Sequence, residues 1–355
     1  MFQINAHRIG PGHPPFIIAE ISANHNGDIS RAKASILAAK QAGAHAVKLQ
    51  TYTADTMTID SDKPGFKISG GLWDGYKLYD LYGEACTPFE WHPELFAYAK
   101  TLGITLFSTP FDETAVDLLE SVNAPAYKIA SFELTDIPLI ERVARTGKPM
   151  LMSTGMAHEG EIREAVEAAR GSGAQSILLF HCISNYPSPI EDANLRNIPW
   201  LREKFGVEVG LSDHTIGHTA AIAAVTLGAT AIEKHFTLSR ADKGPDSEFS
   251  IEPDELQVLV QSTRDAWAAL GSGDLKRPDR EKSSLVFRRS LYFVKDLKAG
   301  EVITPDAVRS VRPALVFELG FEGIQASGRH RRRSPAGVRY AAGHGAWGRC
   351  CSVRD

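Results

Sequence analysis

The chain has 355 residues, a net charge of −4, and 43% hydrophobic and 23% charged residues, a composition typical of soluble globular proteins. No stretch approaches the roughly 18 consecutive apolar residues of a membrane-spanning helix. The N-terminus also lacks the basic-then-apolar pattern of a signal peptide. Four scattered cysteines exclude a disulfide framework and favour a cytoplasmic protein.

Eight short apolar runs, each followed by a helix-like stretch, occupy most of the chain up to residue 268. The runs cover residues 16–21, 46–50, 105–110, 126–131, 149–154, 176–181, 208–213 and 231–236. Continuous apolar runs are typical of strands buried on both faces. Eight strand–helix units predict an α/β fold, a (β/α)8 TIM barrel, whose catalytic groups lie at the C-terminal strand ends.

The connection after the second run, residues 51–91, is unusually long and rich in Gly, Asp, Tyr and Trp. A loop of this length in a compact domain is usually functional or partly structured. On a barrel it would lie over the catalytic face, so we expect a substrate lid.

The chain is longer than one barrel needs, which predicts a second, smaller domain. We expect a barrel domain over residues 1–270, a polar linker over 271–284 and a partial second domain over 285–326. That domain should contain a strand, a Lys-Ala-Gly turn, a second short strand and a helical turn opened by Thr304-Pro305. Residues 327–355 hold seven arginines, one acidic residue and no lysine. Without interleaved aromatic residues they do not indicate nucleic-acid binding, and we expect an atypical tail, disordered or out of frame.

Two histidines stand at neighbouring strand ends, His214 after the seventh run and His235 in the eighth. Adjacent strands lie about 4.8 Å apart, so both imidazoles could bind one divalent cation and leave positions open for water and substrate. The alternative is that each histidine is a structural residue bonded to a backbone carbonyl. Asp246, in the loop after the eighth run, lies near the predicted mouth, although such loop acids are usually only solvated.

Lys48 and Lys128 end the second and fourth runs, and buried lysines need partners. They could form salt bridges with Glu20 or another strand-end acid. They could instead neutralise a phosphate or carboxylate, with hydroxyl groups nearby as further donors. A lysine that forms a Schiff base is a third possibility. Glu20 could act as a general base or orient a sugar hydroxyl. The hydroxyl donors are Thr109, Ser131, Ser153 and Ser212.

The strand-end motifs together resemble the sialic acid synthase family, which condenses phosphoenolpyruvate with an N-acylated amino sugar. The matching segments are AEISANHNGD, VKLQTY, FSTPFD, YKIAS, STGM, HCISNYPSP, GLSDHTIG, IEKHFTL and GPDSEFSIEPDEL. They cover all eight units of the barrel. The segments FRRSLYFVKDLKAGEVIT and VRP resemble the family's C-terminal antifreeze-like (SAF) domain.

The resemblance implies roles for individual residues. His214 and His235 would hold a divalent cation, typically Mn2+, with Mg2+ or Co2+ as alternatives. Glu20 and Asp246 would position the sugar and move protons. The phosphoenolpyruvate and sugar contacts would come from Lys48, Gln50, Thr109, Lys128, Ser131, Ser153, Tyr186 and Ser212. Ser184 occupies a position where sialic acid synthases often carry Asn, so that contact departs from the family pattern.

Within the family, SANHN, LWDGYKLYDLYGEACTPFEWH and SNYPSPIEDANL are most similar to the enzymes that make pseudaminic acid. The implied reaction joins phosphoenolpyruvate, 2,4-diacetamido-2,4,6-trideoxy-altrose and water to give pseudaminic acid and phosphate. The alternatives are an N-acetylneuraminate or legionaminate synthase, a Schiff-base aldolase, and a catalytically impaired sugar-binding protein.

The resemblance also implies a homodimer in which the C-terminal domain of one subunit caps the barrel of the other. The matching arginine of that domain is Arg312. The family pattern continues Arg-Pro-Gly, whereas this chain reads Arg-Pro-Ala and then departs from the pattern near residue 314. We therefore expect an incomplete cap. Neither a nucleic acid nor a membrane is implied as a partner.

Overall fold

The computed structural model describes residues 2–71, 73–276 and 278–314. The chain divides into two compact units, with the boundary between Ser272 and Gly273. The Arg-rich tail predicted for residues 327–355 lies outside the described residues. No helix in the described part of the chain is long and apolar enough to cross a membrane.

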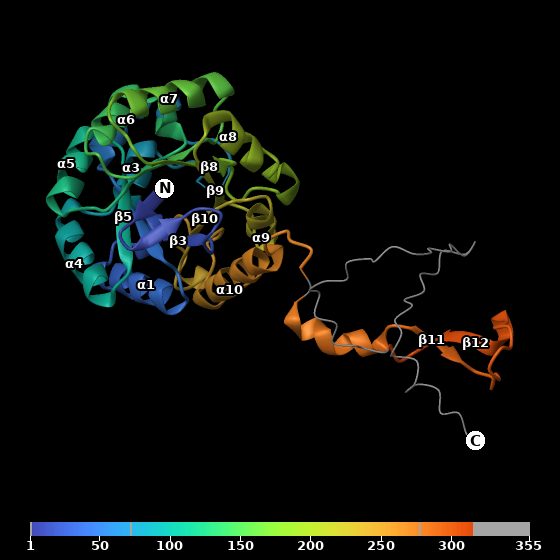
Figure 1. Cartoon of the computed structure of the whole chain (residues 1–355). Coiled ribbons are helices and arrows are strands. Elements are labelled where there is room, and N and C mark those ends of the chain that lie inside the picture. The colour runs from blue at the N-terminus through green and yellow to red at the C-terminus, as the bar shows by residue number, and fades with distance from the viewer. Residues whose placement is uncertain (1, 72, 277, 315–355) are drawn as a thin grey trace. The chain divides into compact units, whose positions relative to one another are not determined.

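Within the described residues of the first unit, eight parallel strands close into a barrel and helices surround it (Figure 1). This confirms the predicted (β/α)8 fold. The strand order around the barrel follows the chain, with the last strand paired to the first. The strands are β3 (Phe16–Glu20), β4 (Ala46–Thr51), β5 (Thr105–Pro110), β6 (Tyr127–Ile129), β7 (Met150–Ser153), β8 (Ile177–Cys182), β9 (Glu208–Asp213) and β10 (Ala231–His235).

A helix follows each barrel strand, and several begin where the sequence supplies a cap. The side chains of Asp28, Asp112 and Asp136 accept hydrogen bonds from the first-turn amides of their helices, which satisfies donors that have no partner inside the helix. The helices are α1 (Ile29–Gln41), α4 (His92–Leu102), α5 (Glu113–Ser121), α6 (Ile137–Ala144), α7 (Glu159–Gly171), α8 (Asn197–Phe205), α9 (Thr219–Thr226) and α10 (Pro253–Leu270).

Both faces of the barrel strands are buried, as their continuous apolar runs predict. Ile17, Val47 and Ile232 belong to the large cluster beneath the helices, whereas their neighbours Ile18 and Ala231 belong to a separate cluster inside the barrel. Successive side chains of a strand point to opposite faces, so alternate residues of each strand line the interior.

A short hairpin closes the end of the barrel where the strands begin. It consists of β1 (Phe2–Ile4) and β2 (His7–Ile9). Phe2, Ile4 and Ile9 join the interior cluster with Phe16 and Ala231, the first residues of β3 and β10. Asn5 also donates to the Thr105 hydroxyl at the start of β5. The hairpin therefore leaves the C-terminal strand ends as the open end of the barrel.

The long connection after β4 contains local structure: α2 (Ala54–Met57) and α3 (Leu78–Ala85). Its Trp73 indole donates a hydrogen bond to the carbonyl of Pro245 in the loop after β10. The connection therefore contacts the C-terminal end of the barrel, where a lid was expected.

The described part of the second unit contains one antiparallel pair, β11 (Ser290–Phe293) and β12 (Val308–Val311), together with a 3-10 helix over Asp279–Phe287. The helical turn opened by Thr304-Pro305 is present over Pro305–Ala307. The second strand predicted before that turn is wrong, because residues 301–304 form no strand. The strand that pairs with β11 follows the turn instead.

Candidate active site

The inward-facing side chains change from apolar to polar as each strand approaches its C-terminal end. β4 presents Ala46, then Lys48 and Gln50, and β10 presents Ala231, then Glu233 and His235. The same alternation brings in Glu20, Thr109, Lys128, Ser153 and Ser212 from the other strands. A band of polar groups therefore lies above the apolar filling of the barrel.

Two lysines and two glutamates form the centre of this band. Lys48 pairs with Glu20 on the adjacent strand, and its ammonium nitrogen also donates to Thr109 at 3.1 Å. Lys128 donates to Glu233 Oε1 at 2.6 Å, and Lys48 lies 3.9 Å from the same oxygen. All four side chains are at least 94% buried. Buried charges of both signs must be paired in this way, because each is expensive to remove from water alone.

The two carboxyl groups differ in their affinity for a proton. Burial raises the pKa of Glu20 to about 7, against the opposing effect of Lys48. Burial also acts on Glu233, but Lys128 and Lys48 outweigh it and lower its pKa. Burial lowers the pKa of Lys128, whereas in Lys48 the attraction of Glu20 overcomes burial and raises the pKa. Glu233 therefore stays ionised and balances the charge of the lysines, whereas Glu20 can exchange a proton near neutral pH.

His214 and His235 lie side by side, with ring centroids 5.4 Å apart. The Nδ1 atom of His214 is 2.8 Å from the carbonyl oxygen of Ile183, and a carbonyl can only accept, so Nδ1 carries the proton and Nε2 the lone pair. The Nδ1 atom of His235 is buried without a hydrogen-bond partner. Burial, together with His214, keeps the pKa of His235 well below its usual value, so its ring is neutral.

These two residues fit a divalent cation. A metal-binding histidine usually donates its other N–H to a carbonyl or carboxylate, which His214 does, and the unpartnered nitrogen of His235 offers a second lone pair. Burial lowers the pKa of His214, but Cys182 and the Ile183 carbonyl outweigh it and raise the pKa. No group of three or more potential ligands is present among the described residues, so further ligands would come from water and substrate.

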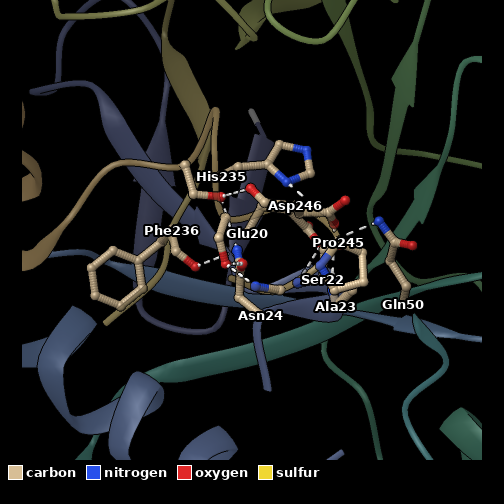
Figure 2. Close-up of polar contacts among 12 residues, drawn as sticks. Glu20, Ser22, Ala23, Asn24, Gln50, His235, Phe236, Pro245 and Asp246 are labelled. Atoms are coloured by element: carbon tan, nitrogen blue, oxygen red, sulfur yellow. Dashed lines mark hydrogen bonds and ion pairs between the residues drawn. The ribbon is translucent and has the colours of Figure 1, made fainter. Parts of the chain in front are cut away.

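The loop after β10 brings Asp246 next to His235 (Figure 2), with 3.9 Å between Asp246 Oδ2 and His235 Nδ1. Burial raises the pKa of Asp246, and a hydrogen bond from the Ala23 amide partly offsets this. Asn24 ties this loop to the end of β3, because its amide donates to Phe236 O and Ser250 Oγ. Asp246 is thus a buried acid held at the mouth rather than a solvated one.

Three of the predicted hydroxyl groups lie on the other side of the mouth. Ser131 directly precedes the 3-10 helix after β6, rather than ending the strand as predicted, and its hydroxyl accepts from the Gly155 amide. The Ser184 hydroxyl is buried without a partner. A side chain at Gly155 would clash with both, since its Cβ would lie 2.2 Å from Ser184 Oγ and 2.7 Å from Ser131 Oγ. Ser153 is buried at the end of β7.

Aromatic rings cover the histidines. The Tyr186 ring lies 4.2 Å from that of His214, and the Phe249 ring lies 4.9 Å from that of His235. Trp73 contacts both Tyr186 and Phe249, at 6.2 and 6.4 Å. The sequence indicated Tyr186 but not the other two, because they lie in loops far from it in the chain.

Two further carboxylates were not assigned from the sequence. Glu233 pairs with both lysines, and this pairing depends on strands that are far apart in the sequence. Glu133 follows β6 with one carboxylate oxygen buried and unpartnered, and burial raises its pKa to about 7. Arg312, in contrast, lies in the second unit directly after β12.

Comparison with known proteins gives matches over most of the chain. The NeuB family profile matches residues 35–275, and the SAF domain profile matches residues 288–319. Pseudaminic acid synthase from Helicobacter pylori is 47% identical over 303 residues, 85% of this chain and 89% of that protein. N,N'-diacetyllegionaminic acid synthase from Campylobacter jejuni is 38% identical, over 84% of this chain and 90% of that protein.

Among solved structures, N-acetylneuraminic acid synthetase from Leptospira borgpetersenii, in complex with citrate, superimposes with a TM-score of 0.72 at 32% identity. The match covers 80% of this chain and 94% of that protein. The resemblance to sialic acid synthases is thereby confirmed, including the SAF domain. The chain belongs to the NeuB family.

Proposed function

We propose that this protein is a pseudaminic acid synthase. It condenses phosphoenolpyruvate with 2,4-diacetamido-2,4,6-trideoxy-altrose and water to give pseudaminic acid and phosphate. C3 of phosphoenolpyruvate forms a bond to the aldehyde carbon of the open-chain sugar, water adds at C2, and the C2–O bond to phosphate breaks. The 47% identity to a pseudaminic acid synthase over 85% of the chain supports this sugar over the alternatives.

One feature of the geometry carries the proposal: a lysine cluster and a histidine pair occupy the same barrel mouth. A phosphate ester and a carboxylate together need several positive charges and hydrogen-bond donors. Lys48 and Lys128 supply the charges, and the hydroxyl groups of Thr109, Ser131, Ser153, Ser184 and Ser212 supply donors. Gln50, 3.5 Å from Glu20, lies at the same edge.

Beside this cluster, at the ends of β9 and β10, His214 and His235 would hold a divalent cation, which we propose is Mn2+. When bound, such a cation polarises a carbonyl oxygen as a Lewis acid and orients the reactants. Glu20 and Asp246 flank the histidines with pKa values raised by burial, so each can hold or release a proton near the reacting carbon. Tyr186 packs on His214 and lines the sugar side.

Phosphate release tests this function directly. Purified protein with phosphoenolpyruvate and Mn2+ should release phosphate with the 2,4-diacetamido sugar and at least tenfold more slowly with N-acetylmannosamine. EDTA should stop the reaction, and added Mn2+ should restore it. Faster turnover of N-acetylmannosamine would assign a sialic acid synthase instead. Sugar binding without phosphate release would indicate an impaired binding protein.

A Schiff-base aldolase is the second candidate, because burial lowers the pKa of Lys128 and a neutral amine is the nucleophile in such enzymes. Borohydride should then trap substrate on Lys128, and EDTA should have no effect. The ion pair of Lys128 with Glu233 favours the synthase instead.

We further propose a cytoplasmic homodimer with exchanged C-terminal domains, in which Arg312 reaches the partner's sugar site. The match to the SAF domain supports this arrangement. Sedimentation of the full chain should then give a dimer. Mixing an Arg312→Ala variant with a His235→Ala variant should restore part of the activity that each lacks alone.

A further inference from the structure

The aromatic rings at the mouth form a wall with an inner and an outer end. Tyr186 and Phe249 form the inner end, packed on His214 and His235. Trp73 forms the outer end, because its ring contacts those two aromatic rings. The three aromatic residues come from the loops after β4, β8 and β10. Three separate loops therefore converge on one aromatic surface.

The indole N–H of Trp73, at the outer end of this wall, is not available to a ligand. The Trp73 Nε1 hydrogen is bonded to the Pro245 carbonyl at 3.0 Å, and this contact fixes the ring orientation. Phe249 has no polar atom in its side chain and is 5% exposed. A ligand group that meets Trp73 and Phe249 thus meets carbon surface alone.

Trp73 is separated from His214 and His235 by the rings of Tyr186 and Phe249. Under the proposed function, on which this inference rests, the aldehyde carbon lies at His214 and His235. The rest of a six-carbon open chain extends past Tyr186 and Phe249, so C6 is the carbon that reaches Trp73. The C6 of the proposed substrate is a methyl group, whereas a sugar such as N-acetylmannosamine carries a hydroxyl there.

We propose that Trp73 is a specificity-determining residue that selects 6-deoxy sugars by packing against the C6 methyl group. A hydroxyl at C6 would leave water and find no partner on Trp73 or Phe249, which disfavours binding. An apolar pocket rejects an added hydroxyl by a factor of up to about 100. The long connection after β4, predicted as a lid, thereby takes part in substrate choice.

The test compares two substrates that differ only at C6: 2,4-diacetamido-2,4,6-trideoxy-altrose and its 6-hydroxy counterpart. The wild-type protein should favour the 6-deoxy sugar in kcat/KM by about 10- to 100-fold. Trp73→Ala should reduce kcat/KM about tenfold for the 6-deoxy sugar and less than about threefold for the 6-hydroxy sugar. Most of the loss should appear in KM, because Trp73 lies away from the reacting carbon. Trp73→Phe, which keeps an aromatic ring, should retain most of the preference.

Tyr76→Ala is the matched control, because Tyr76 is an exposed aromatic residue of the same connection. It should leave the ratio unchanged. If Trp73→Ala fails to fold, Trp73→Leu refills most of the volume without a flat ring and should show the same reduced ratio. Equal losses for both sugars, or a wild-type ratio near one, would overturn the inference while phosphate release still upheld the proposed function. No phosphate release with either sugar would instead overturn the proposed function, and this inference with it.

Discussion

The lysine side of the barrel mouth (Lys48, Lys128, Glu20 and Glu233) and its histidine side (His214 and His235) stabilise their buried polar groups in different ways. On the lysine side, each charge is matched by another protein charge, with Glu233 shared between Lys48 and Lys128. On the histidine side, burial keeps the pKa of His235 low, and His235 Nδ1 has no hydrogen-bond partner among the described residues. The lysine side is therefore matched in charge without ligand, with Glu233 Oε2 as a buried oxygen that accepts no hydrogen bond from the described residues, whereas the histidine side has a ring nitrogen available for a ligand. Mutations should consequently damage stability on one side and binding on the other.

The largest effect should come from the histidine side. His235→Ala removes a ring whose Nδ1 makes no hydrogen bond to the described residues, so the loss of folding stability should come only from the packing of that ring on Phe249 and Tyr186. Activity should fall about 10³-fold or more, because a Lewis acid contributes several kcal/mol to the transition state. Metal content after gel filtration, measured by mass spectrometry, should fall in parallel.

His181→Ala provides the control for that measurement. His181 is also a buried strand-end histidine, but its Nε2 is already bonded to the Ala193 carbonyl at 2.7 Å. This variant should lose stability yet keep its metal. Full activity in metal-free His235→Ala protein would contradict the assignment of the histidine pair.

Glu233→Gln should have the next largest effect, this time on stability. The change leaves two buried ammonium groups with one carboxylate, and breaking a buried pair costs about 3–5 kcal/mol. Urea unfolding at pH 7 should show this loss, and the loss should shrink at high pH as Lys128 releases its proton. Glu141→Gln, in an exposed pair with Arg145, should cost less than about 1 kcal/mol. Equal losses in the two variants would mean that the lysine side is not charge-matched as described.

The sequence predicted the strand ends well because continuous apolar runs mark strands buried on both faces, and such a run is a local feature of the chain. The positions of Lys48 and Gln50 follow from that of β4, and the position of His235 follows from that of β10. Glu233 could not be assigned, since its role depends on Lys128, which is 105 residues away in the chain. The role of Trp73 likewise could not be predicted from the sequence, because the rings that it contacts lie in the loops after β8 and β10.

The failed strand in the second unit has a similar cause. Val302, Ile303 and Thr304 have high strand propensity, but propensity reflects packing against neighbours. β11 pairs with Val308–Val311 instead. Val302 is 81% exposed, so its apolar side chain has no core to join.

Glu20→Gln tests the difference between the two carboxyl groups on the lysine side. The pKa of Glu20 is about 7 in the folded protein against 4.5 for an exposed glutamate, so the folded state binds more protons between these values. Wild-type stability should therefore fall as the pH rises from 4.5 to 7, by up to about 3 kcal/mol. The Glu20→Gln variant should lack this fall in unfolding experiments without ligand.

Glu233 gives the opposite sign in the same experiment. Its pKa is lowered in the folded state, so its contribution is present above the unfolded value and is lost as the pH falls. An unchanged pH profile in Glu20→Gln would show that Glu20 is ionised throughout, and that both carboxylates serve only as counter-charges.

Gly155→Ala should have the smallest effect and should separate binding from stability at the hydroxyl groups. The new methyl group would displace Ser131 Oγ and Ser184 Oγ, and overpacking of this kind costs about 1–3 kcal/mol. Because both hydroxyls are proposed donors to phosphoenolpyruvate, KM for phosphoenolpyruvate should rise about tenfold, while KM for the sugar stays the same. Ser184→Ala in the Gly155→Ala background should recover stability by removing the closer clash, but should not recover phosphoenolpyruvate affinity. Recovery of both would mean that Ser184 fills space without binding substrate, and that the lysines and the remaining hydroxyl groups hold the anion.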